Sequence, residues 1–403
     1  MKKIYNHISF INLWIGLSVS ELAGSLLTFA LSLMVYKETG TTSDIGIMWL
    51  FYFIPSIIVQ LVVGPYLDRY SKKYILIFIQ LTKGIALFAF IMLFYIFNEL
   101  YLIYIFQVIL GCLTPIFTPV SQAILPNVSS QKDLVQYNSI LDATSKLMIA
   151  CGPIVSGLII SISSSNISIV ISLCLFFMSG ISLCFINEIN NKTIKKDKWI
   201  DQLKEGFSYY FERKEIVKLG NLIFAVQFGV GVITVVNLPY ILNVLNGDMK
   251  DYGIFMASFP LGYVIGASIV KIFKEFKDIK VMIYSLLIAS ITFMLLGFNQ
   301  YILLAYIIEF VSGIALAIFN SYNTTLVQKS IDTKYSGRIF TLRLAIIRTA
   351  IPIGVGFATL FSEVLSIRGL YITNTLIIVL VIVIFTLTYK KNDNIEKITK
   401  SDL

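Results

Sequence analysis

Apolar stretches of about 20 residues recur along the whole of this 403-residue chain. A helix of that length matches the hydrocarbon thickness of a bilayer. Because lipid offers no hydrogen-bond partners, each stretch must pair its own backbone N–H and C=O groups, and a single segment does so only as a helix. Charged residues make up 14% of the chain, against about 25% in soluble domains. We therefore predict an all-α integral membrane protein. The twelve predicted spans cover residues 8–36, 44–67, 74–97, 100–124, 135–160, 167–187, 217–243, 252–273, 279–299, 301–325, 338–362 and 368–389.

The cationic residues are unevenly distributed between the loops. Most of the 32 Lys and Arg residues lie in alternate segments that include both termini, whereas the other loops hold only Lys37, Lys250 and Arg368. Since cytosolic loops retain Lys and Arg, both termini are predicted to be cytosolic. The net charge of +9 is then explained by membrane orientation and anionic inner-leaflet lipid, and nucleic-acid binding is not expected.

One long polar stretch divides the spans into two sets of six. We expect a first six-helix bundle over residues 1–187, a cytosolic linker over 188–216, and a second six-helix bundle with a short cytosolic tail over 217–403. Apolar residues recur at helical spacing within the linker and predict an amphipathic helix along the inner membrane face. Gln136–Ile140 aligns with Arg338–Leu342, which favours a parallel duplication of one six-helix unit.

A short charged hairpin follows the second predicted span. It reads Gly64-Pro-Tyr-Leu-Asp68-Arg69-Tyr-Ser-Lys72-Lys73 and resembles the loop signature G-x-x-x-D-R-x-G-R-K of the major facilitator superfamily, with Ser71 at the position of its second glycine and Lys72 at that of its second arginine. Retention of positive charge in the cytosol explains the lysines but not the aspartate. In that family the loop is a latch between half-domains. The resemblance therefore implies a conformational role for Gly64, Asp68, Arg69, Lys72 and Lys73.

A second motif lies in the fifth span. Cys151-Gly152-Pro153-Ile-Val-Ser156-Gly157 resembles the G-P-x-x-G-G element of proton-coupled drug exporters, with Ser156 in place of one glycine. This implies a helix-packing role for Gly152, Pro153 and Gly157. Ser20–Gly24, Ala123–Pro126 and Gln328 with the later Gly337-Arg338 are similar to the bacterial macrolide-efflux-like branch. The resemblance implies two six-helix bundles related by a pseudo-two-fold axis, and proton-coupled efflux of amphipathic, drug-like molecules by alternating access in the plasma membrane.

Acidic residues inside the spans are the candidates for coupling. An ionisable side chain there costs about 2.5–3.5 kcal/mol on insertion scales, so each needs a reason. Glu21 lies about 20 Å into the first span, near the bilayer midplane. We interpret it as a proton-coupling group or as an attractor of cationic substrate, with a hydrogen-bonded structural acid as the alternative. Glu309, in the tenth span, is the second candidate.

The other charged residues inside the spans are interpreted one by one. Asp142 and Lys146 are four residues apart on one helix face, which favours a structural salt bridge, with gating or proton transfer as the alternative. Lys83 is predicted to snorkel toward the cytosol. Arg348 lies deeper in its span and is expected to need an acidic partner.

Independently of charge, Gly262-x-x-x-Gly266 predicts a close helix–helix approach.

No enzymatic activity, cofactor or metal site is expected. The sequence has no G-x-x-x-x-G-K-[ST] phosphate loop, its one histidine is His7, and its four cysteines lack ligand-like spacing. The expected partners are a small amphipathic substrate, protons and membrane lipid, and the chain is expected to be a monomer. Export of an endogenous siderophore or lipid-like metabolite, nutrient uptake, and a non-transporting receptor or scaffold are the alternatives.

Overall fold

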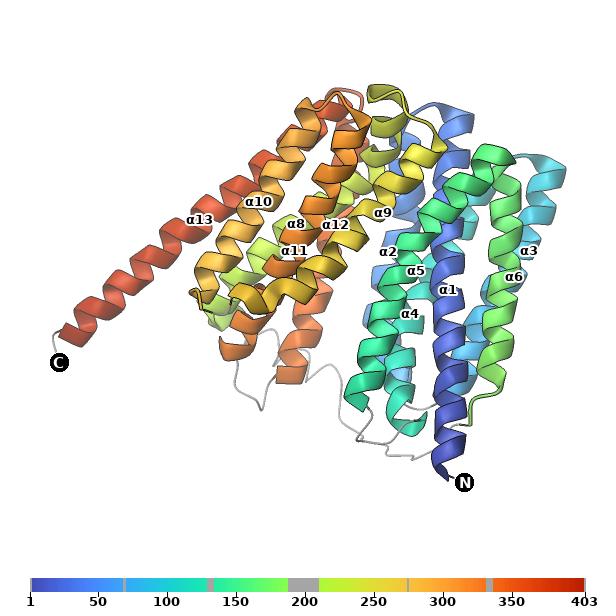
Figure 1. Ribbon diagram of the computed structural model, residues 1–403, viewed down its shortest axis with the longest axis horizontal. Helices are drawn as coiled ribbons and strands as arrows, with labels where there is room; N and C mark the ends of the chain where they lie inside the picture. The colour runs from blue at the N-terminus through green and yellow to red at the C-terminus, as the bar shows by residue number, and fades with distance from the viewer. Residues whose placement is uncertain are drawn as a thin grey trace. The chain divides into compact units, whose positions relative to one another are not determined.

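The structure is a computed structural model, and it describes residues 2–67, 70–128, 134–187, 210–273, 275–330 and 336–401. Those residues form long helices joined by short connections (Figure 1). The linker helix predicted within 188–216 falls largely outside them. The helices are α1 (Lys2–Thr39), α2 (Thr42–Leu67), α3 (Lys72–Phe97), α4 (Tyr101–Val128), α5 (Leu134–Ile162), α6 (Ser165–Cys184), α8 (Lys214–Pro239), α9 (Met249–Ile269), α10 (Asp278–Phe298), α11 (Ile302–Ser330), α12 (Ser336–Phe361) and α13 (Ile367–Ser401). A π-helical turn, Tyr240–Val244, follows α8, and a 3₁₀ turn, Val270–Phe273, follows α9.

Each of the twelve predicted spans corresponds to one of these helices. Eleven helices are long and apolar enough to cross a membrane within the described residues, and α12 contributes a shorter apolar stretch there, Ile347–Phe361. The prediction of an all-α membrane protein is therefore confirmed.

The connection between α1 and α2 shows how the sequence ends one span and begins the next. Gly40 has a φ of 68° and donates its backbone N–H to the carbonyl of Tyr36 at 2.9 Å. Glycine adopts this left-handed conformation without steric cost, so the helix stops there. The hydroxyl of Thr41 then accepts the backbone N–H of Asp44 at 3.3 Å, which caps the start of α2.

Contacts divide the chain into two compact units, and each is described separately. The first unit comprises Met1–Asp197 together with Asn237–Leu261, and the second comprises Lys198–Val236 together with Gly262–Leu403. The segment from the end of α8 to the middle of α9 therefore packs with the first unit. The boundaries predicted at 187 and 217 stay a prediction.

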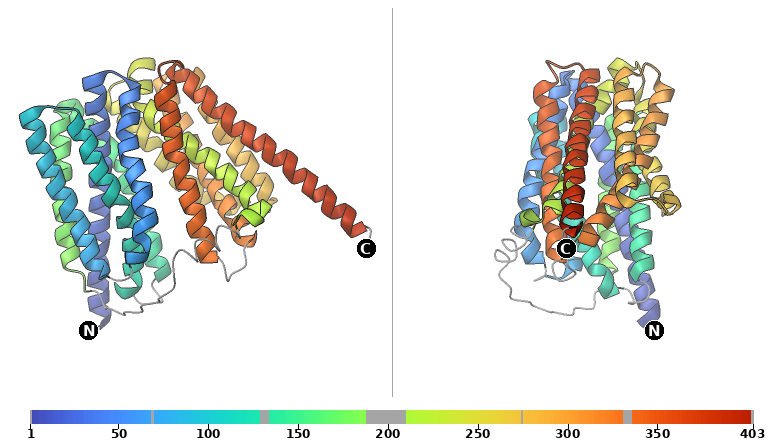
Figure 2. Two further views of the ribbon diagram at one scale, coloured as in Figure 1. Left: turned by 180° about the vertical axis from the view of Figure 1, so that it is seen from behind. Right: turned by 90° about the vertical axis from the view of Figure 1, so that its left-hand side faces the viewer.

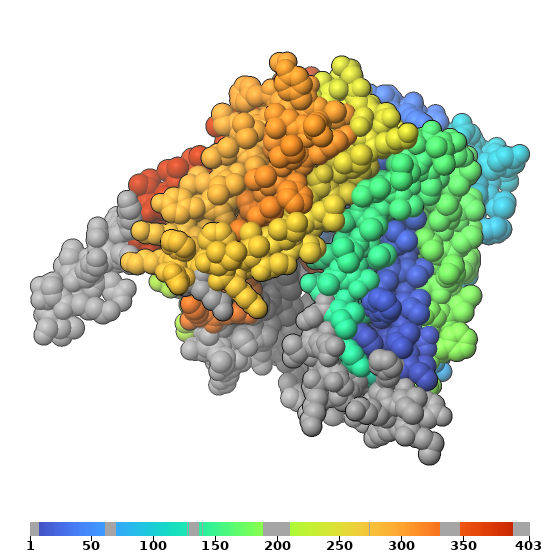
Figure 3. Space-filling view, in the orientation of Figure 1, coloured from blue at the N-terminus to red at the C-terminus, as the bar shows by residue number. Residues whose placement is uncertain are grey.

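In the first unit, α1 lies between α5 and α6 (Figures 1 and 3). The hydroxyl of Ser179 in α6 donates to the carbonyl of Gly16 at 2.6 Å, and the hydroxyl of Ser182 donates to that of Asn12 at 2.9 Å. Small residues and hydroxyl groups at such contacts hold membrane helices together, because lipid provides no hydrophobic drive for their association.

In the second unit, α10 packs against both α11 and α13, the latter the red helix in Figure 2. The approach predicted at Gly262 and Gly266 is confirmed. A Cβ atom at Gly266 would lie 2.5 Å from the carbonyl oxygen of Ile314, and one at Gly262 would meet the backbone of Phe310. Only glycine allows α9 and α11 to come this close.

Candidate functional site

Charged side chains from three helices of the first unit influence one another around Glu21. Glu21 is half-buried in α1, and the two cations that act on it electrostatically are Lys83 of α3 and Lys146 of α5. Conversely, Glu21 is the acid that acts on Lys83. Three helices therefore place one acid and two cations in a common region of the first unit.

The prediction that Lys83 snorkels to the cytosol is wrong. Its side chain is only 4% exposed, and its Nζ lies 5.2 Å from the ring centroid of Phe117 and 5.6 Å from that of Phe176. Both distances are within the range of cation–π attraction. Lys83 shares the packed face of α3 with Leu76, Ile79 and Leu87. This helical spacing was present in the sequence and would have indicated burial.

A hydrogen bond fixes α3 against α1 next to these charges. The side-chain amide of Gln80, one turn before Lys83, donates to the hydroxyl of Ser20 at 2.6 Å. Ser20 directly precedes Glu21. The other amide atom of Gln80, its Oε1, is buried and has no hydrogen-bond partner among the described residues. Gln80 is not among the candidate residues predicted from the sequence, although an amide in the middle of an apolar span is uncommon enough to be noticed.

The salt bridge predicted between Asp142 and Lys146 is not formed among the described residues. Asp142 is exposed, whereas Lys146 is half-buried and acts on Glu21. An i, i+4 spacing permits such a pair but supplies only a few tenths of a kcal/mol.

The motif in α5 lies at close helix contacts. Gly152 and Pro153 are buried, and a Cβ atom at Gly152 would collide with the side chain of Ser25 in α1. At Gly157 it would lie 2.6 Å from the carbonyl oxygen of Met249, at the start of α9. Ser156, which departs from the motif, has its hydroxyl 2.7 Å from that of Ser168 in α6. The motif residues therefore occupy packing positions.

Glu309 is the most enclosed carboxylate among the described residues of the second unit. It lies in α11 and is 3% exposed, and no charge or hydrogen bond from another described residue acts on it. Ser312, one turn further along, is fully buried, and its hydroxyl has no hydrogen-bond partner in the described part of the chain. The two lie on one face of α11, because residues three apart are neighbours on a helix.

A second polar side chain in this unit is buried without hydrogen bonds. Asn374 of α13 is fully buried, and within the described residues neither the oxygen nor the nitrogen of its side-chain amide has a hydrogen-bond partner. It packs on Gly229 of α8, where a Cβ atom would lie 2.8 Å from its Oδ1. Asn374 and Glu309 each lie seven residues from the start of their helices, or about 10 Å along the axis. Buried polar groups without partners are rare and call for an explanation.

The remaining candidate residues are placed as follows. Arg348 is exposed on α12, and Lys72 and Lys73 are half-buried in the first turn of α3. Gly64 lies in α2, while Asp68 and Arg69 fall outside the described residues. The latch role of this hairpin stays a prediction.

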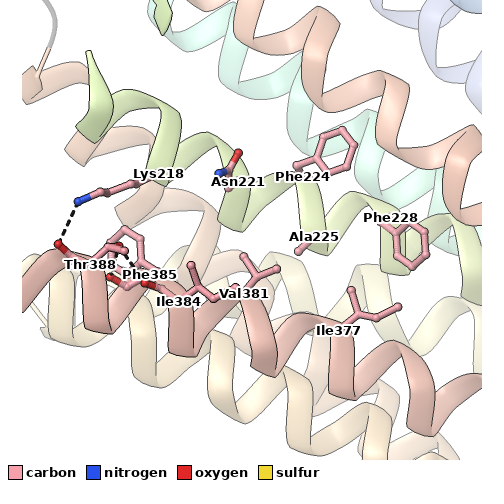
Figure 4. Close-up of a pocket in the computed structure, with 10 residues that line it drawn as sticks. All are labelled: Lys218, Asn221, Phe224, Ala225, Phe228, Ile377, Val381, Ile384, Phe385 and Thr388. Atoms are coloured by element: carbon pink, nitrogen blue, oxygen red, sulfur yellow. Dashed lines mark hydrogen bonds between the residues drawn. The ribbon is translucent and has the colours of Figure 1, made fainter. Parts of the chain in front are cut away.

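An apolar groove of about 320 Å³ lies between α8 and α13 (Figure 4). Ala225 and Phe228 from α8 face Ile377 and Val381 from α13 along it. One end is closed by the amine of Lys218, which donates to the carbonyl of Thr388 at 3.1 Å. This groove could not be predicted from the sequence, because every span is rich in apolar residues. In the described part of the chain, no group of histidine, cysteine and acidic residues is arranged to hold a metal ion.

A comparison with protein families decides the family. The model of the Major Facilitator Superfamily matches residues 13–235 and 219–401. This chain belongs to the major facilitator superfamily. The two overlapping matches each cover about one half of the chain.

Relatives and solved structures agree with this membership. Macrolide efflux protein A of Streptococcus pyogenes is 23% identical over 393 residues, covering 94% of this chain and 96% of the relative. The uncharacterized MFS-type transporter YvqJ of Bacillus subtilis is 21% identical, covering 88% and 84%. The crystal structure of the nucleoside transporter NupG has a TM-score of 0.80 at 13% identity, covering 95% and 99%. A bacterial homologue of the iron transporter ferroportin, in its inward-facing state, has a TM-score of 0.76 at 14% identity, covering 94% and 98%. The structural likeness establishes the fold, and with it the predicted major facilitator architecture.

Proposed function

We propose that this major facilitator transporter exports amphipathic, drug-like molecules of the macrolide type in exchange for protons, by alternating access. It acts as a monomer in the plasma membrane of a bacterium, with both termini in the cytosol. The resemblance to macrolide efflux proteins over 94% of the chain supports the substrate class and the direction. The many aromatic side chains, 30 Phe and 22 Tyr, suit amphipathic organic molecules better than sugars or phosphates.

The observation that carries proton coupling is the isolation of Glu309. An ionised carboxylate in the membrane interior needs a cation or hydrogen-bond donors, and Glu309 has neither among the described residues. The group is therefore neutral while enclosed and ionises only when water reaches it. A carboxylate that alternates in this way carries one proton for each cycle.

Reconstituted vesicles test the proposal. A labelled macrolide should move against its concentration gradient when a proton gradient is imposed, and a protonophore should abolish this uphill movement. Glu309→Gln should lower uphill transport by at least about tenfold, because the amide cannot release a proton, while movement down the macrolide gradient continues. Uphill transport without a proton gradient, or a Glu309→Gln protein with the wild-type pH dependence, would contradict the proposal.

The same vesicles distinguish the alternatives. An exporter of a siderophore or lipid-like metabolite should ignore the macrolide yet transport that metabolite. A receptor or scaffold should transport neither. The exposed carboxylate of Asp142, inside a span but without the enclosure of Glu309, provides the control variant Asp142→Asn.

A further inference from the structure

The groove between α8 and α13 has no part in the proposed function. At one end the amine of Lys218 donates to the backbone carbonyl of Thr388 at 3.1 Å, and Asn221 lies one turn further along α8. Beyond these residues the lining side chains are aliphatic or aromatic, as far as Phe228 on α8 and Ile377 on α13 (Figure 4). The groove therefore has one polar end and is apolar along the rest of its length.

The length of the groove matches one leaflet of a bilayer. Its ends on α8, Lys218 and Phe228, lie about 15 Å apart at 1.5 Å per residue, and its ends on α13, Thr388 and Ile377, lie about 16 Å apart. The hydrocarbon core of a bilayer is about 30 Å thick, so one leaflet contributes about 15 Å. An acyl chain whose headgroup lies beside Lys218 is therefore long enough to follow the groove to its apolar end.

The groove lies beside a face of α13 that is exposed and apolar. Leu376, Leu380 and Leu387 on this face are each more than half exposed, and each directly precedes a residue that lines the groove. Exposed apolar surface of this kind marks contact with a membrane. In a bilayer, acyl chains therefore lie directly beside the groove.

The polar end of the groove carries positive charge. An ammonium group has three N–H donors, and the hydrogen bond from Lys218 to Thr388 uses one of them. Lys214, exposed one turn earlier on α8, adds a second cation, against one acid in the first turn, Glu215. Lysine binds phosphate as a point charge, so this end of the groove suits an anionic headgroup.

We propose that the groove between α8 and α13 binds an anionic phospholipid. Its phosphate lies against Lys218, and one acyl chain lies along the groove toward Phe228 and Ile377. A transported amphipathic molecule also has an apolar part, but the match to the thickness of one leaflet favours a lipid. The proposal uses the predicted orientation only to choose the leaflet, which is the inner one when both termini are cytosolic.

Native mass spectrometry of the purified protein in detergent tests the charge at the polar end. Phosphatidylglycerol, which is anionic, should bind at least about fivefold more tightly than phosphatidylcholine with the same chains, since each cation near an anionic lipid contributes about this factor. Lys218→Met should remove about fivefold of the affinity for phosphatidylglycerol and leave that for phosphatidylcholine unchanged. Lys280→Met, at an exposed lysine of α10, is the control. Equal affinity for the two lipids, or unchanged binding by Lys218→Met, would overturn the proposal.

Tryptophan fluorescence locates the acyl chain. Ile377→Trp places an indole at the apolar end of the groove, and Leu376→Trp places the matched control on the exposed face of α13. In nanodiscs of phosphatidylcholine, a small fraction of phosphatidylglycerol with brominated chains should quench Ile377→Trp more strongly than Leu376→Trp, after subtraction of the wild-type signal. Lys218→Met should abolish this difference. Equal quenching at the two positions would overturn the proposal.

Two further outcomes of these measurements would assign the groove to another occupant. Displacement of the brominated lipid by a macrolide would show that the transported molecule binds there, and a dimer that is lost in Ile377→Trp would show that a second copy of the chain covers the groove. Either result would overturn the proposal. Because neither experiment measures transport, its result does not depend on whether macrolides are exported.

Discussion

The side-chain amide of Asn243 donates a hydrogen bond to the hydroxyl of Tyr36, a residue 207 positions earlier in the chain. Tyr36 lies in the last turns of α1, and Asn243 lies in the π-helical turn after α8. Both belong to the first unit. Nearby in sequence, the rings of Phe29 and Tyr252 lie 4.7 Å apart. These contacts join α1 to a segment that follows α8.

Removal of the Tyr36 hydroxyl should weaken this connection. Tyr36→Phe keeps the ring and deletes one hydrogen bond, for an expected loss of about 1 kcal/mol of stability. Asn243→Ala should cost a similar amount, and the double variant should lose no more than either single variant. Thermal unfolding of the purified proteins measures this. Independent, additive losses would show that the two side chains do not interact.

Gly157→Ala should impair packing of α5 on the start of α9. The added methyl group would lie 2.6 Å from the carbonyl oxygen of Met249, and a backbone atom cannot move aside as a flexible side chain can. We expect a destabilisation of about 1–3 kcal/mol, the usual cost of overpacking. Gly24→Ala is the matched control, since no atom lies within 4 Å of a Cβ there. It should be neutral or slightly stabilising. Equal effects of the two variants would count against the packing role.

Asn374→Leu should raise stability and slow transport. Both amide atoms of Asn374 are buried without hydrogen-bond partners, so replacement by an apolar side chain of similar size removes a desolvation cost of about 1–3 kcal/mol. An amide kept in such a place is expected to bind water or a proton-carrying group during the cycle. The unfolding temperature and the vesicle uptake rate measure the two effects. Normal transport by the variant would show that Asn374 acts only in packing.

Asp68→Asn tests the latch. The substitution keeps the size of the side chain and removes its charge, so the protein should still reach the membrane while turnover falls. Contacts that form in one conformation and break in the other behave in this way. Membrane extracts measure the amount of protein, and vesicles measure turnover. Normal turnover at normal expression would reduce the hairpin to a topology signal.

Reporter fusions test the orientation. A reporter that is active only in the cytosol should work when fused after Lys391 or within residues 192–198, and should fail when fused near Asp248. The basis is the concentration of lysine and arginine on one side of the membrane. Activity of the fusion near Asp248 would overturn the predicted orientation.

Span number, helix type and the close approach of α9 and α11 could be predicted from the sequence, because each depends on local composition or on glycine spacing. The burial of Lys83 could not be predicted from the general behaviour of lysines in membrane spans. Snorkelling is the usual outcome for a lysine near a span end, and only the alignment of Lys83 with Leu76 and Leu87 on the packed face of α3 indicated otherwise.

The remaining site features depend on tertiary packing. Asn374 is one amide in an apolar span, and nothing in the sequence indicates that it lies against Gly229. The packing of Asn237–Leu261 with the first unit depends on contacts between residues far apart in the sequence, such as Tyr36 and Asn243. Hydrophobic periodicity carries no information about such contacts.

The π-helical turn after α8 sets the helical register of the residues that follow it. The backbone N–H of Leu245 bonds to the carbonyl of Tyr240, five residues earlier, so this turn holds one residue more than an α-helical turn. Deletion of one residue here would restore an α-helical pattern. It would also rotate the residues that follow by about 100° and carry the amide of Asn243 away from Tyr36. The number of residues between Pro239 and Asn243, rather than the identity of any one side chain, therefore directs the side-chain amide of Asn243 toward α1.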